Sequence, residues 1–134
     1  MKFARYVRLY ADRRGDTHFE DIKVPLEIEE FVPPAGPINI ADFLPVSSSF
    51  LLGAPADWNG DMPHPSPRRQ LLCTVQGEYE ITVSDGEVRC FPAGSILLLE
   101  DTTGKGHKTN ITYSKGVLVF GVVIDDSNNE RKNS

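Results

Sequence analysis

The residues best suited to chemistry in this sequence are two histidines, His64 and His107. An imidazole can both accept and donate a proton near neutral pH, and it is also the commonest protein ligand for a metal ion. Ser66, Arg68 and Gln70 follow His64 at alternate positions. Alternate side chains of an extended strand share one face, so these four residues are expected to point the same way. The pattern predicts a polar site that moves protons or holds a metal.

The segment from Gly60 to Gly77, GDMPHPSPRRQLLCTVQG, resembles the first cupin motif, G(X)5HXH(X)3,4E(X)6G. His64 takes the place of the first histidine, and Gln70 takes that of the glutamate, with six residues between Gln70 and Gly77. Ser66 stands at the second histidine position, and three residues instead of five separate Gly60 from His64. The segment therefore keeps the first histidine of the motif but lacks its second histidine and its glutamate.

A second resemblance lies between Gly94 and Asn110, to the motif G(X)5PXG(X)2H(X)3N. The run TTGKGH, which ends at His107, replaces the PXGXXH core, with two additional residues after Gly94, and Asn110 comes one residue early. The two motifs lie within residues 60–110 of the 134-residue chain. This resemblance implies an all-β cupin fold, the double-stranded β-helix or jelly-roll barrel, with His107 expected on the wall opposite His64.

Cupins commonly bind a transition metal through three histidines and a glutamate. The resemblance leaves His64, Gln70 and His107 as ligands, so the expected cofactor is either none or one divalent ion, Mn, Fe, Ni or Zn. Cupin hydroxynitrile lyases carry glutamine at the position of Gln70 and hold metal, but they keep the histidine that is lost here. The metal-free epimerase and dehydratase branches instead imply proton transfer by His64 and His107.

The leading functional hypothesis is a lyase or isomerase acting on a small polar or carbonyl metabolite, with His64, His107 and Arg68 as catalytic residues. A guanidinium at Arg68 could pair with a ligand carboxylate or phosphate, whereas Arg69, of opposite parity, is expected in an ion pair on the outer face. One alternative is a non-catalytic ligand-binding cupin. Another is a metal-dependent oxygenase or lyase with a reduced ligand set.

Four further side chains are expected to bind the small-molecule ligand: Gln70, Ser66, Trp58 and Lys105. Trp58 comes shortly before His64 and could line the mouth of the pocket or pack under the N-terminal arm. Lys105 lies in the loop EDTTGKG, whose spacing does not fit the phosphate-binding pattern GXXXXGK[ST]. We interpret this loop as a barrel rim.

Turn signals at intervals of roughly ten residues separate short apolar runs from Ser47 onward, as in a β-sandwich or barrel. The expected strands are 47–52, 69–75, 79–84, 88–91, 95–99, 107–113 and 117–124, with turns at 76–77 and 85–86. Residues 1–46 are interpreted as an N-terminal extension packed on the barrel or a dimer partner, extended over 2–9 and 22–28. Residues 47–124 are expected to form the barrel and residues 125–134 a fraying tail. The best helical candidate is one or two turns over Ile38 to Leu44.

The chain has 134 residues, which fits one domain, and a formal net charge of −5, which disfavours nucleic acid. No apolar run is long enough to span a membrane, and the first residues lack a secretory signal, so a cytoplasmic location is the default. Cys73 and Cys90 are then expected to be reduced, packed thiols on neighbouring strands. A homodimer is expected because cupins often pair through sheet edges and N-terminal strands.

Overall fold

The structure, a computed structural model, describes residues 2–127, and every element in this range is a β-strand. The all-β prediction is therefore confirmed. The strands are β1 (Phe3–Ala11), β2 (Thr17–Pro25), β3 (Glu27–Glu29), β4 (Ile38–Ile40), β5 (Val46–Ala54), β6 (Gly60–His64), β7 (Gln70–Val83), β8 (Val88–Pro92), β9 (Ile96–Leu99), β10 (His107–Ile111) and β11 (Val117–Ile124). Over residues 2–127, no helix is long and apolar enough to cross a lipid bilayer.

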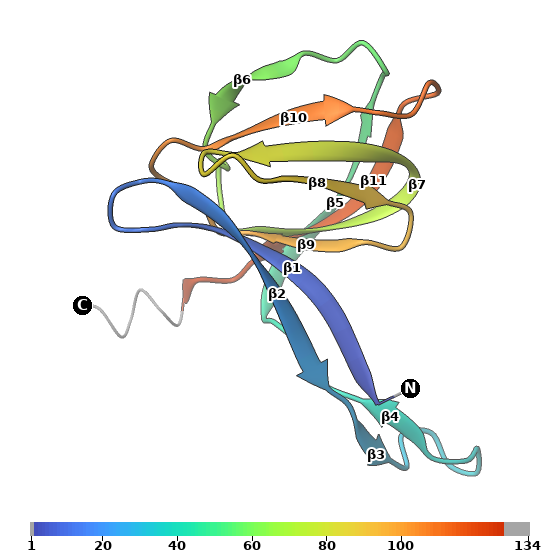
Figure 1. The fold of residues 1–134 in the computed structure, drawn as a ribbon. Coiled ribbons are helices and arrows are strands. Elements are labelled where there is room, and N and C mark those ends of the chain that lie inside the picture. The colour runs from blue at the N-terminus through green and yellow to red at the C-terminus, as the bar shows by residue number, and fades with distance from the viewer. Residues whose placement is uncertain (1, 128–134) are drawn as a thin grey trace.

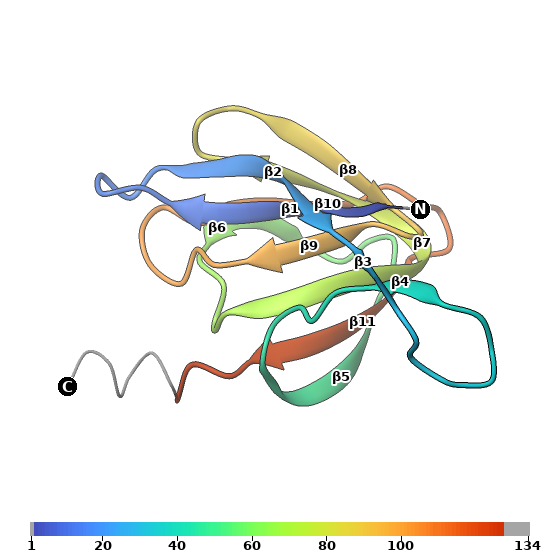
Figure 2. The ribbon, with the colours of Figure 1, turned by 90° about the horizontal axis from the view of Figure 1, so that it is seen from below.

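Nine of the strands form a flattened barrel of two layers, and β7 belongs to both (Figure 1). The first half of β7 pairs with β9 and β11, which gives a layer in the order β2, β1, β9, β7, β11, β5 (Figure 2). The second half of β7 pairs with β8 and β10, and β10 pairs with β6. A single long strand thus joins the two walls of the barrel.

The predicted turn at Gln76 and Gly77 is wrong, because β7 runs unbroken through both residues. Gly77 has a φ of +82°, and a Cβ there would lie 2.2 Å from the carbonyl oxygen of Gly116. The pairing of β11 with β7 shifts register between Leu118 and Val119, beside this point. A glycine bulge therefore bends one strand from the first layer into the second.

The core fills the space between the layers. Leu9, Ile81, Phe91 and Leu97 are each no more than 2% exposed. Along the second half of β7, buried Tyr79, Ile81 and Val83 alternate with partly exposed residues, as expected for a strand with one face in the core. The buried residues cluster with members of both layers. Burial of the apolar side chains on the inward faces of the two layers therefore stabilises the barrel.

Residues 3–25 form the β1–β2 hairpin at one side of the first layer. β1 pairs with β9 in parallel, with Leu9 opposite Leu99, and this is the one parallel pair among the described strands. Leu9 and Phe19 reach the core cluster. The hairpin thus contributes buried side chains to the barrel as well as main-chain pairing.

Residues 26–45 instead form an arm that projects from the barrel, with β3 and β4 as a separate two-stranded sheet (Figure 1). The helical turn predicted over Ile38 to Leu44 is wrong, since Ile38–Ile40 pairs with Glu27–Glu29. The β-branched residues Ile38 and Ile40 favour the extended conformation. The arm is exposed along both strands apart from Ile40, which is half-buried.

Cys73 on β7 and Cys90 on β8 are both free thiols. Cys73 is half-buried, but Cys90 is exposed, so the prediction of packing is wrong for Cys90. Its side chain lies on the outer face of β8, between the inward-facing Phe91 and the partly buried Arg89.

Residues 128–134 of the predicted tail lie outside the described range. At the start of the tail, the amide of Asp125 donates a hydrogen bond to the carbonyl of Pro45 at 2.8 Å.

Candidate functional site

His64 and His107 are cross-strand neighbours. His64 ends β6 and His107 begins β10, and the two residues lie opposite each other in the antiparallel pairing of these strands. Their ring centroids are 5.1 Å apart, with 48° between the ring planes. The expectation that His107 approaches from the opposite wall is wrong, because residues 60–64 form a strand that the sequence did not reveal. The two imidazoles meet as neighbours in one layer.

Gly106 allows this close approach. Its φ is +73°, and a Cβ on Gly106 would lie 2.2 Å from the carbonyl carbon of His64 and 2.5 Å from the nitrogen of Pro65. A side chain of any size would collide with backbone atoms, which cannot turn away as a flexible side chain can. Glycine at this position therefore lets the segment leading to His107 pack directly on the end of β6.

Asp101 holds the ring of His107. Asp101 Oδ2 lies 2.6 Å from His107 Nδ1, and the two residues are 0% and 4% exposed. The carbonyl of Asp101 also accepts a hydrogen bond from the amide of Ser66 at 2.9 Å. When the imidazole is neutral, donation from Nδ1 to the carboxylate leaves the Nε2 lone pair free. Sequence analysis missed Asp101, treating its loop only as a rim.

The ring of His64 is held by a backbone carbonyl and not by a carboxylate as in His107. Its Nδ1 lies 3.0 Å from the carbonyl oxygen of Met62, a group that can only accept, so Nδ1 carries the proton. Within residues 2–127 the Nε2 atom of neither histidine makes a hydrogen bond to the protein. His64 is exposed while His107 is buried. One ring can thus exchange protons with solvent, and the other is sheltered from it.

Both histidines line a cavity of about 230 Å³ inside the barrel. Its polar lining consists of His64, Ser66, Gln70, Tyr79, His107 and Thr109, and the remainder is apolar: Leu52, Gly53, Ala54, Trp58, Pro67, Leu72, Ile81, Leu99, Ile111, Val117 and Val119. The residues come from both layers of the barrel. Five of the predicted site residues, His64, Ser66, Gln70, His107 and Trp58, are therefore brought together around one space.

No protein-family model and no curated protein matches this sequence. Among solved structures, the chain is similar to the "Schizosaccharomyces pombe Cnp3 Cupin Domain". The two chains are 12% identical with a TM-score of 0.46, and the match covers 96% of this chain and 93% of that one. At this identity and TM-score, the chemistry of the site has to be argued from its own residues.

Arg68, predicted to share a face with Gln70, does not line the cavity. Residues 65–69 are not a strand, and Pro65 and Pro67 cannot donate the backbone hydrogen bonds that a continuous strand would need. Arg68 Nε donates to Gln70 Oε1 at 3.3 Å, and the guanidinium lies 5.1 Å from the centre of the Phe50 ring. The alternation expected over these residues therefore fails at Arg68.

The predicted ion pair of Arg69 is confirmed. Its guanidinium lies 2.6 Å from Glu100 Oε2 and also pairs with Asp126. Glu100 in turn pairs with Arg8 of β1 at 2.5 Å. Arg69 is thus committed to a cluster of charges outside the cavity.

Lys105, a predicted ligand-binding residue, faces the β1–β2 turn instead of the cavity. Its Nζ lies 2.7 Å from Asp16 Oδ1, and its amide donates to the carbonyl of Gly15 at 2.8 Å. Beside it, the hydroxyl of Thr17 donates to the carbonyl of Gly106 at 2.7 Å. These contacts tie the β1–β2 turn to the loop that carries Asp101 and His107. The N-terminal hairpin therefore helps to position the site.

His18 supports the same turn, and its contacts predict a pH-dependent stability. Its Nε2 lies 2.7 Å from Asp12 and its Nδ1 2.8 Å from Asp85, and these hydrogen bonds raise the pKa of His18 above 6.5. A raised folded-state pKa gives stabilisation that is complete below the unfolded value and is lost as the pH rises through the folded value. From about pH 6 to about pH 9, the thermal midpoint of the wild type should fall more than that of His18→Gln. Parallel profiles in differential scanning calorimetry would contradict this.

The residues around the cavity do not fit a divalent transition metal. Over residues 2–127, no group of three or more His, Cys, Asp or Glu side chains could hold a metal ion. The hydroxyl of Ser66 donates to the carbonyl of Arg68 at 2.7 Å, and Gln70 Oε1 accepts from Arg68. Two imidazoles and an engaged amide make a poor donor set, since stable sites usually supply three or four nitrogen, sulfur or carboxylate ligands.

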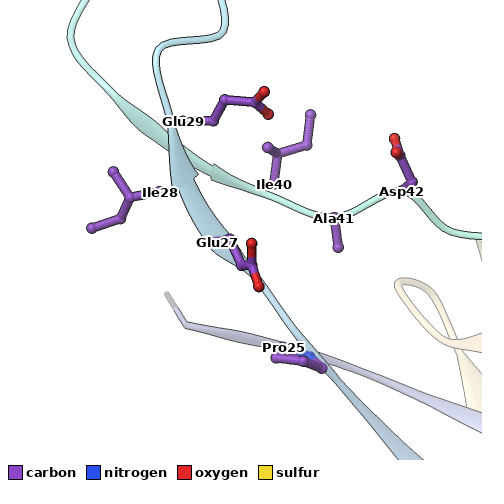
Figure 3. A pocket seen from close by; sticks show the side chains of 7 residues that line it. All are labelled: Pro25, Glu27, Ile28, Glu29, Ile40, Ala41 and Asp42. Atoms are coloured by element: carbon purple, nitrogen blue, oxygen red, sulfur yellow. The ribbon is translucent and has the colours of Figure 1, made fainter.

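A second hollow, of about 420 Å³, lies against the arm (Figure 3). Its lining includes the carboxylates of Glu27, Glu29 and Asp42, which Figure 3 shows spread around it beside Ile40. All three acidic residues are exposed. The hollow has none of the buried polar contacts that order the barrel cavity, so the cavity is the candidate site.

Proposed function

We propose that the chain is an enzyme that transfers protons on a small carbonyl compound, as a lyase or an isomerase. The observation that carries this proposal is the buried pair of Asp101 and His107, 2.6 Å apart, beside a second imidazole on the same cavity. Carboxylate, imidazole and a sheltered apolar space are the components of general acid–base catalysis.

In this proposal His107 is the base. Its Nε2 takes a proton from the carbon next to the substrate carbonyl, the C–H electron pair forms a C=C bond, and the carbonyl π electrons move to oxygen. Asp101 accepts the Nδ1 hydrogen bond throughout and stabilises the imidazolium that forms. Return of the proton to the opposite face of that carbon, or to another carbon of the conjugated system, completes an isomerisation. Departure of a group from the next carbon with its bonding electrons, as the carbonyl re-forms, completes an elimination. Asp101 is a positioning residue, because it reaches the substrate only through His107.

His64 and Gln70 have supporting roles. His64 is exposed at the cavity, so it can pass protons between solvent and the substrate oxygen or carbon. Gln70 uses Oε1 to accept from Arg68, which leaves its amide NH₂ group to donate to a carbonyl oxygen. Donation to the oxygen that gains negative charge would stabilise the enolate more than the starting ketone.

The proposal is tested by following exchange of α-hydrogens for deuterium in D₂O by proton NMR, with phenylacetone as the substrate. The wild type should accelerate the exchange above the buffer rate, and His107→Gln should lose about 100-fold or more of the acceleration. Lys115→Gln, a neutralised exposed side chain outside the cavity, is the matched control and should keep the wild-type rate. Exchange at the buffer rate in the wild type, with phenylacetone shown to be bound, would contradict the proposal and favour a non-catalytic binder.

A further inference from the structure

No permanently charged side chain lines the cavity. Among residues 2–127, none of its lining residues is Asp, Glu, Lys or Arg. The nearby cations are engaged elsewhere: Arg68 with Gln70 and Phe50, Arg69 with Glu100 and Asp126, and Lys105 with Asp16. A ligand carboxylate or phosphate would lose its hydration in this space without gaining a permanent counter-charge, which is unfavourable. The buried carboxyl of Asp101 behind His107 adds to the disadvantage of an anion.

Most of the lining is aliphatic, and it comes from strands of both layers. Leu52, Leu72, Ile81, Leu99, Ile111, Val117 and Val119 supply these side chains. A dry apolar cavity of about 150 Å³ accommodates benzene, so a volume of 230 Å³ has room for about ten non-hydrogen atoms. A strongly hydroxylated sugar of this size would leave its own polar groups unpaired against the aliphatic wall. The shape and polarity favour a compact, mostly apolar molecule.

Tyr79 adds an aromatic face to this wall. The residue is 3% exposed, lines the cavity and stacks on Phe91 with ring centroids 5.3 Å apart. Its buried hydroxyl lies near Thr74, which does not line the cavity. Burial raises the pKa of Tyr79, so the phenol stays uncharged. Tyr79 therefore adds apolar ring surface to the wall and no charge.

We infer that the cavity takes an uncharged, mostly apolar ketone or aldehyde of about ten non-hydrogen atoms, whose oxygen is held by donors from the protein and whose hydrocarbon part fills the aliphatic wall. This inference rests on the proposed function for the carbonyl group, and it goes beyond it by setting the charge, polarity and size of the substrate. It also replaces the polar metabolite of the sequence-based hypothesis with an apolar one.

Two matched probes test the substrate class. Phenylacetone is a neutral ketone of this size, and phenylpyruvate carries a carboxylate next to the same benzyl ketone. Trp58 is the one tryptophan of the sequence and lines the cavity, so quenching of its fluorescence reports binding directly. Phenylacetone should bind at least tenfold more tightly than phenylpyruvate.

Val119→Phe fills part of the cavity and is the blocking control. It should abolish saturable quenching while circular dichroism shows the β-sheet spectrum of the wild type. Phenylpyruvate binding as tightly as phenylacetone would overturn the inference, and so would the absence of saturable binding by either probe. Phenylacetone binding without α-hydrogen exchange would leave the ligand class standing and contradict the proposed proton transfer, so the two failures are distinguishable.

Discussion

Replacing Asp101 with asparagine is expected to lower the rate of α-hydrogen exchange by about 100-fold to 10,000-fold while the chain stays folded. The side chains have the same size, and the backbone hydrogen bond from Ser66 to residue 101 is retained. An amide, however, can turn its NH₂ group toward His107 Nδ1 and stabilise the opposite tautomer. The proton then sits on Nε2, where the proposed base needs a lone pair.

The matched control is Asp126→Asn, which also neutralises a carboxylate but does so outside the cavity, in the cluster with Arg69. This variant should keep the exchange rate within about threefold. Binding of phenylacetone, measured by Trp58 fluorescence, should be unchanged in Asp101→Asn, because Asp101 acts through His107 and does not line the cavity. A wild-type exchange rate in Asp101→Asn, or an equal loss of binding and exchange, would remove Asp101 from the mechanism.

Gly106→Ala is expected to destabilise the fold by about 3 kcal/mol or more in urea unfolding. Two costs add at this position: the left-handed backbone at φ +73° and the collision of the new Cβ with backbone atoms of His64 and Pro65. The collision can be relieved only by separating the ends of β6 and β10. The proximity of the two imidazoles should therefore be lost together with the stability.

Gly94→Ala measures the cost of the left-handed backbone alone, without a collision of the new Cβ. Gly94 has a φ of +93°, but nothing lies within 4 Å of a Cβ built there. Its replacement should cost only about 1 kcal/mol, the penalty of the left-handed conformation. Equal urea midpoints for the two variants would show that the close approach of Gly106 to His64 contributes nothing to the stability.

Much of the barrel was predictable because short local sequence patterns determine several of its turns. Asp85 and Gly86 connect β7 to β8 as a tight hairpin, with Gly86 at φ +99°, as the Asp-Gly pair indicated. The spacing of His64, Gln70 and His107 against the cupin motifs also predicted their convergence, and all three line the cavity. Motif spacing succeeds here because it encodes strand lengths, which fix where the motif residues meet.

The predictions that failed concern features that depend on contacts between residues far apart in the sequence or on local interruptions of a strand. Gln76 and Gly77 read as a turn because the close contact with Gly116 that bends β7 is far away in sequence. Arg68 was placed by strand alternation, which two nearby prolines interrupt. Asp101 could not be distinguished from other loop acids, because its role depends on burial against His107. A carboxylate six residues before a candidate histidine is nevertheless a feature that could have been weighed.

The most direct test of the account is the tautomer of His107, measured by nitrogen-15 NMR of histidine side chains. The sequence contains three histidines, so His18→Gln and His64→Gln suffice to assign the signals. At a pH where the ring is neutral, we expect His107 to carry its proton on Nδ1, shifted far downfield by the short bond to Asp101, with a bare Nε2. A proton on Nε2, or rings that interconvert freely between tautomers, would contradict the proposed site.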